Sequence, residues 1–218
     1  MWLDLQVQRR LQAAGQSFVL DVALQCTQRQ VVLFGPSGAG KSLTLKAVAG
    51  LLRPGQGHVR LQGQTLFDAA AGVDLPPQRR RLGYVFQDYA LFPHLSVRQN
   101  VAFGLQKGWL NPRAGQRFDA VEQWLHAFRI DAVGDLLPSQ VSGGQRQRTA
   151  LARALVTQPQ ALLLDEPFSA LDHDLRQELE TVLDKTGIPL LLISHDPQDV
   201  AMFGQQVARV VDGRIVGG

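Results

Sequence analysis

The residues from Gly35 to Ser42 have the types and the spacing that suit phosphate binding. They read Gly35-Pro36-Ser37-Gly38-Ala39-Gly40-Lys41-Ser42, which fits the pattern G-x-x-x-x-G-K-[ST]. Glycines let the backbone curl so that successive N–H groups point inward toward an anion. Lys41 can reach the β- and γ-phosphates of a nucleotide, and the Ser42 hydroxyl can bind Mg²⁺. We therefore predict a nucleotide-binding loop that comprises these residues and the adjacent Leu43.

Two adjacent carboxylates, Asp165 and Glu166, follow the apolar run 161–164. Open α/β sheets bind their ligands at the carboxyl ends of such strands. Asp165 is placed to orient Mg²⁺, and Glu166 could polarise an attacking water as a general base. A carboxylate after a strand often caps the next helix instead. The adjacent pair, in a chain that already carries a phosphate-binding loop, favours catalysis.

Gln87 and His195 also follow apolar runs, at 83–86 and 190–193. An amide oxygen can ligate Mg²⁺ and hydrogen-bond a water, although surface glutamines are common. A lone histidine is usually structural. Considered singly, each residue could therefore have a structural role instead of a catalytic one.

The stretch Ser142-Gly143-Gly144-Gln145 places a hydroxyl and free backbone N–H groups at a predicted helix start. Such an arrangement can bind a second anion, and an ordinary helix cap is the alternative. One nucleoside triphosphate does not need two such sites from one fold. If both sites bind phosphate, this one completes the nucleotide pocket of another subunit.

The hydrophobic pattern predicts the strands that position these residues. Fully apolar runs predict buried strands at 31–34, 83–86, 161–164 and 190–193, with two closing strands at 207–211 and 214–216. Alternating patterns predict a small antiparallel sheet that contains residues 3–7, 18–24, Val59, Leu61 and Leu66. Buried strands that alternate with helices indicate an α/β fold with a mainly parallel sheet.

Helical patterns dominate from Asp88 to about Thr157, which we interpret as a helical insertion. Further helices are expected directly after Ser42 and from about Asp174. The loop before the strand at 83–86 carries the cluster Arg79-Arg80-Arg81. We interpret this cluster as a solvated loop face, and contact with a phosphate-rich or acidic neighbour is the alternative.

The composition suits a globular protein with a sizeable core. Of the 218 residues, 45% are hydrophobic, and the formal net charge is +3. The single Cys26 excludes an internal disulfide and suits a reducing compartment. No apolar run approaches the roughly 20 residues that cross a bilayer, and the N-terminus lacks a secretory signal pattern. The modest positive charge permits nucleic-acid contact but is more often a property of a solvated surface.

The motifs and their order resemble those of ATP-binding cassette (ABC) ATPases, the nucleotide-binding subunits of ABC transporters. The resemblance spans nearly the whole chain. In chain order, the motifs resemble Walker A at 35–42, the Q-loop at Gln87, the signature at 141–145, Walker B at 162–166, the D-loop at 169–172 and the switch histidine at His195. Six ordered matches are far more specific than any single one.

The resemblance implies a head-to-tail dimer of two identical cassettes with two ATP molecules between them. The phosphate-binding loop of one cassette would face Ser142 and Gly144 of the other, and Asp172 would contact the partner. Glu166 would be the base that hydrolyses ATP to ADP and phosphate, and His195 would hydrogen-bond the γ-phosphate.

The resemblance also implies how metal and membrane subunits are bound. Mg²⁺ would be held by Ser42, by Gln87 and, through water, by Asp165. Gln87 would link the nucleotide to the helical region, which grips transmembrane permease subunits, while a substrate-binding protein takes part indirectly. The chain would therefore lie peripherally on the cytoplasmic face of the inner membrane, and no nucleic-acid partner is expected.

The implied organisation is a single ABC ATPase domain over residues 1–218. Its P-loop NTPase core would comprise 1–87 and 158–218, with a helical subdomain at 88–157. Many importer ATPases carry a C-terminal regulatory domain, and we expect none here. Two further departures concern Val141, which replaces a leucine, and the adenine contact, because residues 10–15 contain no aromatic residue. Phe18 is nearby and is the candidate substitute.

The transporter class and substrate are also suggested by resemblance. The segment 88–97 resembles bacterial importers, in which it receives a helix of the permease, and residues 66–87 look most like molybdate-importer ATPases. Importers for sulfate, thiamine or polyamines are alternatives. A soluble ABC ATPase that acts on nucleic acid is a rival class, as is a non-catalytic nucleotide-binding regulator. Intact Lys41, Asp165, Glu166 and His195 argue against the regulator.

Overall fold

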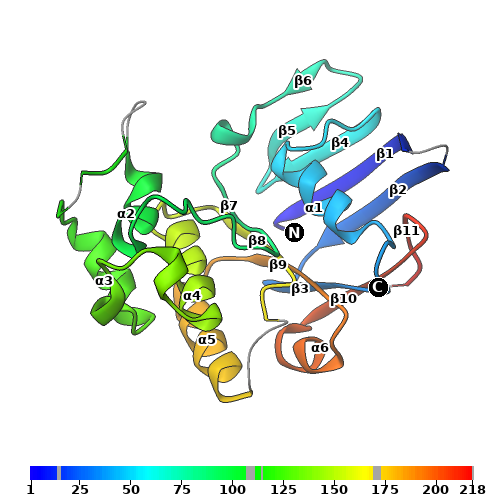
Figure 1. Cartoon of the computed structure of the whole chain (residues 1–218). Coiled ribbons are helices and arrows are strands. Elements are labelled where there is room, and N and C mark those ends of the chain that lie inside the picture. The colour runs from blue at the N-terminus through cyan, green and yellow to red at the C-terminus, as the bar shows by residue number, and fades with distance from the viewer. Residues whose placement is uncertain (14–15, 107–110, 114, 169–172, 218) are drawn as a thin grey trace. The chain divides into compact units, whose positions relative to one another are not determined.

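The computed structural model describes residues 1–13, 16–106, 111–113, 115–168 and 173–217 (Figure 1). The chain divides into two compact units. The first comprises Met1–Leu82, Leu163–Glu166 and Pro189–Gly218, and the second comprises Gly83–Leu162 and Pro167–Ile188. The second unit is larger than the predicted helical subdomain at 88–157, because 83–87, 158–162 and 167–188 also belong to it.

An antiparallel sheet forms one part of the first unit. It contains β1 (Leu3–Ala13), β2 (Gln16–Cys26), β4 (Gln56–Leu61), β5 (Gln64–Asp68) and β6 (Val73–Asp74), in the order β6-β5-β4-β1-β2. Leu5 pairs with Leu24 of β2 and with Val59 of β4, and all three side chains are buried. The alternation of apolar and polar residues buries one face of each strand. The predicted antiparallel sheet is confirmed.

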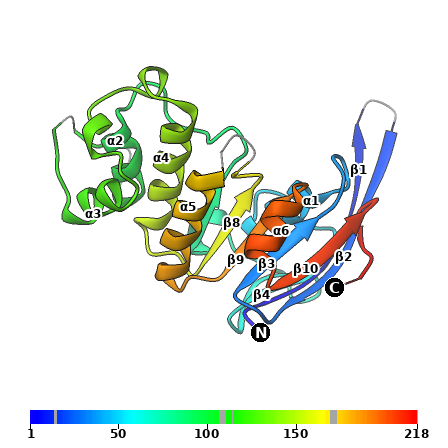
Figure 2. The same cartoon turned by 90° about the horizontal axis from the view of Figure 1, so that it is seen from below.

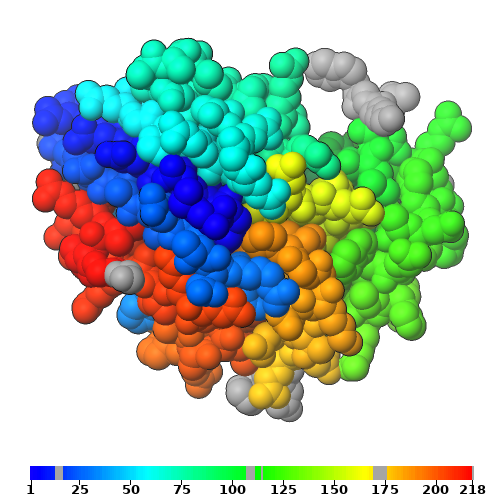
Figure 3. Space-filling view, turned by 180° about the vertical axis from the view of Figure 1, so that it is seen from behind, coloured from blue at the N-terminus to red at the C-terminus, as the bar shows by residue number. Residues whose placement is uncertain are grey.

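The sheet of the first unit continues in the order β2-β11-β10-β3-β9-β8, in which β3 is parallel to β9 and β10, and β11 is antiparallel to β10. Its further strands are β3 (Gln30–Phe34), β9 (Leu190–Ser194), β10 (Gln206–Val211), β11 (Arg214–Ile215) and the carboxyl end of β8 (Ala161–Asp165). β3 pairs in parallel with both β9 and β10, and β10 turns back into β11. On the surface in Figure 3, cyan β4 and β5, dark blue β1, medium blue β2 and the red closing strands follow one another in this order.

Two helices flank the parallel strands of the first unit. The predicted helix after Ser42 is α1 (Lys41–Ala49), which packs against β2 and β9. A second helix, α6 (Pro197–Phe203), packs against β3 and β9 and was not predicted (Figure 2). Its start has ordinary helix signals, because Asp196 accepts a hydrogen bond from the Gln198 N–H and Pro197 occupies the first turn.

Arg80 is buried, which corrects the interpretation of the arginine cluster as a solvated loop face. Arg79 and Arg81 are exposed, but Arg80 is only 1% exposed. Its guanidinium donates to the carbonyl oxygens of Ala47 at 3.0 Å and Val48 at 2.9 Å, and it pairs with Asp74. The last carbonyl groups of a helix have no partner within that helix, so a buried helix end requires external donors. Arg80 supplies them to α1.

The second unit is mainly helical, and most of its residues belong to the helical insertion that the sequence predicts from Asp88 to about Thr157. It contains most of β7 (Leu82–Val85) and the helices α2 (Val97–Ala102), α3 (Asp119–Ala127), α4 (Gly143–Leu155) and α5 (His173–Thr186). α2, α3 and α4 pack against one another, and Val121 and Leu125 of α3 are fully buried. Short 3₁₀ turns lie at Phe103–Leu105, Asp131–Val133 and Pro138–Gln140. In the part of the chain that is described, no helix is long and apolar enough to span a bilayer.

Candidate functional site

The predicted phosphate-binding loop connects β3 to α1 and has the curled backbone that such a loop requires. Gly38 and Gly40 have φ angles of 80° and 99°, in the left-handed region that favours glycine. A Cβ atom on Gly35 would lie 2.2 Å from the Val210 carbonyl oxygen, so no larger residue fits there. No side chain caps the N-terminus of α1. Its first N–H groups are therefore suited to an anion.

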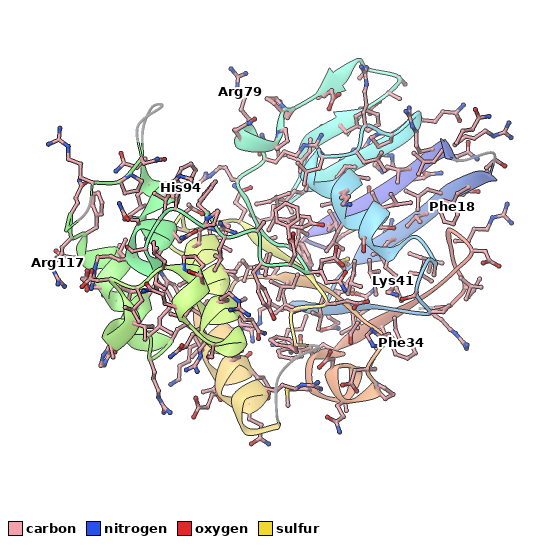
Figure 4. The ribbon with its side chains drawn as sticks, viewed as in Figure 1. Phe18, Phe34, Lys41, Arg79, His94 and Arg117 are labelled. Atoms are coloured by element: carbon pink, nitrogen blue, oxygen red, sulfur yellow. The ribbon has the colours of Figure 1, made fainter. Side chains whose placement is uncertain are left out.

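The Lys41 side chain is folded over this loop (Figure 4). Its ammonium group donates to the carbonyl oxygens of Gly35 at 2.7 Å and Pro36 at 2.9 Å, and the residue is 4% exposed. Burial lowers the pKa of Lys41, while the carboxylates of Glu166 and Asp165 act in the opposite direction. An ammonium group held at a glycine-rich loop suits the binding of a phosphate group.

Ser42 and Asp165 lie next to each other at the start of α1 and the end of β8. The Ser42 hydroxyl donates to Asp165 Oδ1 at 3.0 Å, and Asp165 is 6% exposed. A hydroxyl and a carboxylate are hard oxygen ligands of the kind that Mg²⁺ prefers. The two residues therefore fit a Mg²⁺ ion beside the phosphate-binding loop.

Glu166 and His195 form a second contact in the same unit. Glu166 Oε1 lies 3.2 Å from His195 Nδ1, and the Glu166 N–H donates to the Ile193 carbonyl oxygen. Glu166 has a φ of 48°, which is rare for a residue with a side chain and is often found at functional sites. His195 is mostly exposed, so its free ring edge is available to a ligand.

Ser194 and Asp199 support the backbone at His195, and the sequence did not indicate them. The buried Ser194 hydroxyl donates to Asp199 Oδ2 at 2.6 Å and accepts from the Asp196 N–H at 2.9 Å. This network ties the end of β9 to the start of α6. The pattern Asp196-Pro197, which is typical of a helix start, could have indicated α6 but not its link to Ser194.

Phe18 lies beside the phosphate-binding loop. A Cβ atom on Gly40 would be 3.0 Å from the Phe18 ring, and one on Gly213 would be 3.1 Å from it. Figure 4 labels Phe18 on β2 and Lys41 at the start of α1. Phe18 is partly exposed, so an aromatic surface is present near the phosphate site.

The other predicted site residues belong to the second unit or lie outside the described residues. Gln87 follows β7 and is exposed. Ser142 caps α4: its hydroxyl accepts from the Gln145 N–H at 3.2 Å, and the Gln145 side chain accepts from the Ser142 N–H at 2.9 Å. Gly143 and Gly144 form the first turn of α4. Asp172 and the rest of residues 169–172 lie outside the described residues.

Comparison with known proteins identifies the family of this chain. The family model for ABC transporters matches residues 20–169. The chain belongs to the ABC transporter family.

Several curated ABC relatives match this cassette over most of its length. It is 42% identical to the molybdate/tungstate import ATP-binding protein WtpC of Archaeoglobus fulgidus, over 99% of this chain and 86% of the relative. It is 39% identical to the molybdenum import ATP-binding protein ModC of Rhizobium etli, over 99% of this chain and 59% of the relative. It is 44% identical to the sulfate/thiosulfate import ATP-binding protein CysA of a Synechocystis strain, over 85% of this chain and 51% of the relative. The cassette thus spans most of the first relative and little more than half of the other two.

Solved structures share the fold of this cassette. An ATP-binding cassette in a dimeric post-hydrolysis state, bound to ADP and phosphate, matches with a TM-score of 0.83 and 28% identity. The match covers 99% of this chain and 96% of that one. A dimeric bacterial ABC transporter cassette matches with a TM-score of 0.81 and 27% identity. The predicted α/β fold of an ABC ATPase is confirmed.

Proposed function

We propose that this cassette binds and hydrolyses ATP to power an ABC importer. The observation that carries the proposal is the cluster in the first unit, in which Ser42 contacts Asp165 and Glu166 contacts His195, beside the loop that holds Lys41. These groups are the ones that phosphoryl transfer to water needs: a phosphate cradle, a cation, a metal site and a base.

The residues of the first unit divide the chemistry among them. Lys41 and the backbone N–H groups of residues 38–42 hold the β- and γ-phosphates in place. Glu166 accepts the proton of the attacking water, and His195 keeps the γ-phosphate and Glu166 aligned. Ser42 and Asp165 would hold a Mg²⁺ ion, and Gln87 of the second unit would be a further ligand by resemblance; the ion would supply positive charge beside the phosphates.

The adenine base has a candidate contact in Phe18. Its partly exposed ring borders Gly40 of the phosphate-binding loop. An aromatic ring binds a nucleobase by stacking, which depends little on the identity of the base. We therefore propose that Phe18 stacks on adenine, since residues 10–15 contain no aromatic residue that could do so.

Two copies of the cassette are proposed to share two ATP molecules. Ser142, Gly143, Gly144 and Gln145 would contact the nucleotide held by the partner subunit, and Asp172 would contact the partner itself. The start of α4 supports this role, because its Ser142 cap is exposed and its glycines leave the first-turn N–H groups unshielded. The similar solved cassettes that are dimeric also support it.

The membrane subunits are proposed to bind the segment 88–97, here called the docking segment. Leu91 and Phe92 are partly exposed, and the Phe92 ring lies 4.3 Å from that of Phe103, which is 37% exposed. Exposed aromatic and aliphatic side chains of this kind are typical anchors for a partner protein. The cassette would thus lie on the cytoplasmic face of the inner membrane, and a substrate-binding protein would take part on the other side.

Molybdate is the proposed substrate of the transporter. The relatives named for molybdate, tungstate or molybdenum import support it, and the relative named for sulfate and thiosulfate favours a related oxyanion as the second candidate. Import of thiamine or polyamines and a soluble function on nucleic acid are less supported alternatives.

Reconstitution tests this proposal. The cassette, its membrane subunits and its binding protein are placed in vesicles with ATP, and uptake of molybdate, tungstate and sulfate is compared. We expect ATP-dependent uptake of molybdate that sulfate does not displace at equal concentration. If none of the three oxyanions stimulated ATP hydrolysis, the assignment of molybdate as the substrate would be contradicted. If the purified cassette carried nucleic acid and no membrane subunits, a soluble ABC ATPase that acts on nucleic acid would be favoured.

A further inference from the structure

The docking segment contains two consecutive residues in an unfavourable backbone conformation. Tyr89 has a φ of 63° and Ala90 a φ of 43°, although neither is a glycine. The left-handed region places Cβ close to the backbone, so residues with side chains remain there only when their surroundings hold them. Contacts from other residues must therefore stabilise this turn.

Arg153 of α4 supplies the contacts that hold the turn. Its Nη1 donates to the Ala90 carbonyl oxygen at 2.8 Å, and its Nη2 donates to the Tyr89 carbonyl oxygen at 2.7 Å. The same guanidinium lies over the Phe92 ring, 5.6 Å from its centroid. A planar guanidinium can make all three contacts at once, whereas a lysine ammonium cannot match this geometry.

Arg153 contacts this turn from α4, and a residue of another helix holds the rest of the docking segment. Asn100 of α2 accepts from the Phe92 N–H and donates to the carbonyl oxygens of Phe92 and Leu95. Burial lowers the pKa of Arg153, and the Asp88 carboxylate acts in the opposite direction. Because Arg153 holds the strained turn from α4 by two hydrogen bonds, the position of the turn depends on the position of α4.

The helix that carries Arg153 begins with the signature residues. Ser142 is the N-cap of α4, and the helix runs without interruption from Gly143 to Leu155. A rise of about 1.5 Å per residue places Arg153 roughly 16 Å along the axis from Ser142. A helix is stiff over this length, so a displacement at Arg153 moves the whole of α4.

We propose that Arg153 is a positioning residue that transmits the docking of the permease on the docking segment, by way of Tyr89 and Ala90, to the signature end of α4. The proposal rests on the proposed function, in which segment 88–97 receives the permease and Ser142 faces the partner's nucleotide. A permease that shifts the turn pulls on the Arg153 guanidinium and thereby moves Ser142.

The test compares Arg153→Gln, Arg153→Lys and the control Arg129→Gln. Arg129 is an exposed arginine of the same unit that pairs with Glu178. ATP hydrolysis is measured for the cassette alone and in the assembled transporter, and binding of the permease is measured by co-purification. For Arg153→Gln we expect hydrolysis by the cassette alone within about twofold of wild type, retained binding of the permease, and a loss of permease stimulation of about 5- to 20-fold, which is at the lower end of typical couplings between two sites. Arg129→Gln should behave as wild type.

A second variant separates transmission from stability. Glycine adopts a positive φ without steric cost, so Ala90→Gly lets the turn form with less help from Arg153. Added to Arg153→Gln, it should restore thermal stability but not permease stimulation, because the link to α4 is still missing. Restored stimulation would show that Arg153 only stabilises the turn and would overturn the proposal.

Two other results would also overturn the proposal. One is an equal loss of activity with and without permease, and the other is a loss of permease binding itself. If Arg153→Gln does not fold, Arg153→Lys carries the same expectations, since it keeps the charge but not the forked contact. Absence of ATP hydrolysis by the wild-type cassette would instead refute the proposed function.

Discussion

Replacement of Arg80 by methionine should destabilise the cassette strongly, although Arg80 lies outside the proposed active site. The side chain is 1% exposed and donates to the carbonyl oxygens of Ala47, Val48 and Leu75. Methionine has a similar length but no donor, so these acceptors lose their partner. Each unsatisfied buried polar group costs about 1–3 kcal/mol, and part of this cost is recovered by water and by relaxation.

The expected total for Arg80→Met is about 3–5 kcal/mol of unfolding free energy, which is the usual cost of breaking a buried charged contact. For a chain of this size, each kcal/mol lowers the melting temperature by about 2–4 °C, so a decrease of roughly 6–20 °C is expected. Thermal unfolding followed by circular dichroism measures it. The exposed neighbour provides the control, and Arg79→Met should change stability by less than about 0.5 kcal/mol. Equal melting temperatures for Arg80→Met and Arg79→Met would refute the assignment of Arg80 as the cap of α1.

Two further predictions concern the phosphate-binding loop. Gly35→Ala should lower the free energy of unfolding by about 1–3 kcal/mol, because its Cβ would lie 2.2 Å from the Val210 carbonyl oxygen. An unchanged midpoint of urea unfolding would show that the loop can accommodate a Cβ at this position. Phe18→Leu should weaken ATP binding by about 1–3 kcal/mol through the loss of stacking, whereas Phe18→Tyr should retain the wild-type affinity. The dissociation constants are measured by calorimetry. Equal values for wild type, Phe18→Leu and Phe18→Tyr would show that Phe18 does not contact adenine.

The strands and the phosphate-binding loop could be predicted from the sequence because their signals are local. A fully buried strand reads as an apolar run, as at 190–193, and a curled loop needs glycine at Gly38 and Gly40. The positions of Asp165 and Glu166 follow from the end of their strand. Local patterns of this kind place a residue on an element without any knowledge of its distant neighbours.

The roles of Arg80 and Arg153 could not be predicted in this way. Each role depends on hydrogen bonds to carbonyl groups that are distant in the sequence. Arg80 donates to Ala47 and Val48. Arg153 donates to Tyr89 and Ala90. An arginine is usually exposed, so composition alone favours the solvated interpretation. The inclusion of residues 167–188 in the second unit likewise depends on tertiary packing.

The signature stretch is intermediate between these cases. Its helix start was predicted, and the structure places the Ser142 hydroxyl and the Gln145 side chain in reciprocal capping hydrogen bonds. A capping box satisfies two donors at the start of a helix and is compatible with an anion at the remaining N–H groups. The contact with a partner's nucleotide stays a prediction.

Glu166 is proposed to be the base of ATP hydrolysis, and the Glu166→Gln variant removes that base. Glutamine keeps the shape of the side chain but cannot accept the proton of water. We expect the assembled transporter that carries this variant to bind ATP with the affinity of wild type and to hydrolyse it about 10²–10⁴-fold more slowly. Hydrolysis at the wild-type rate by this variant would contradict the assignment.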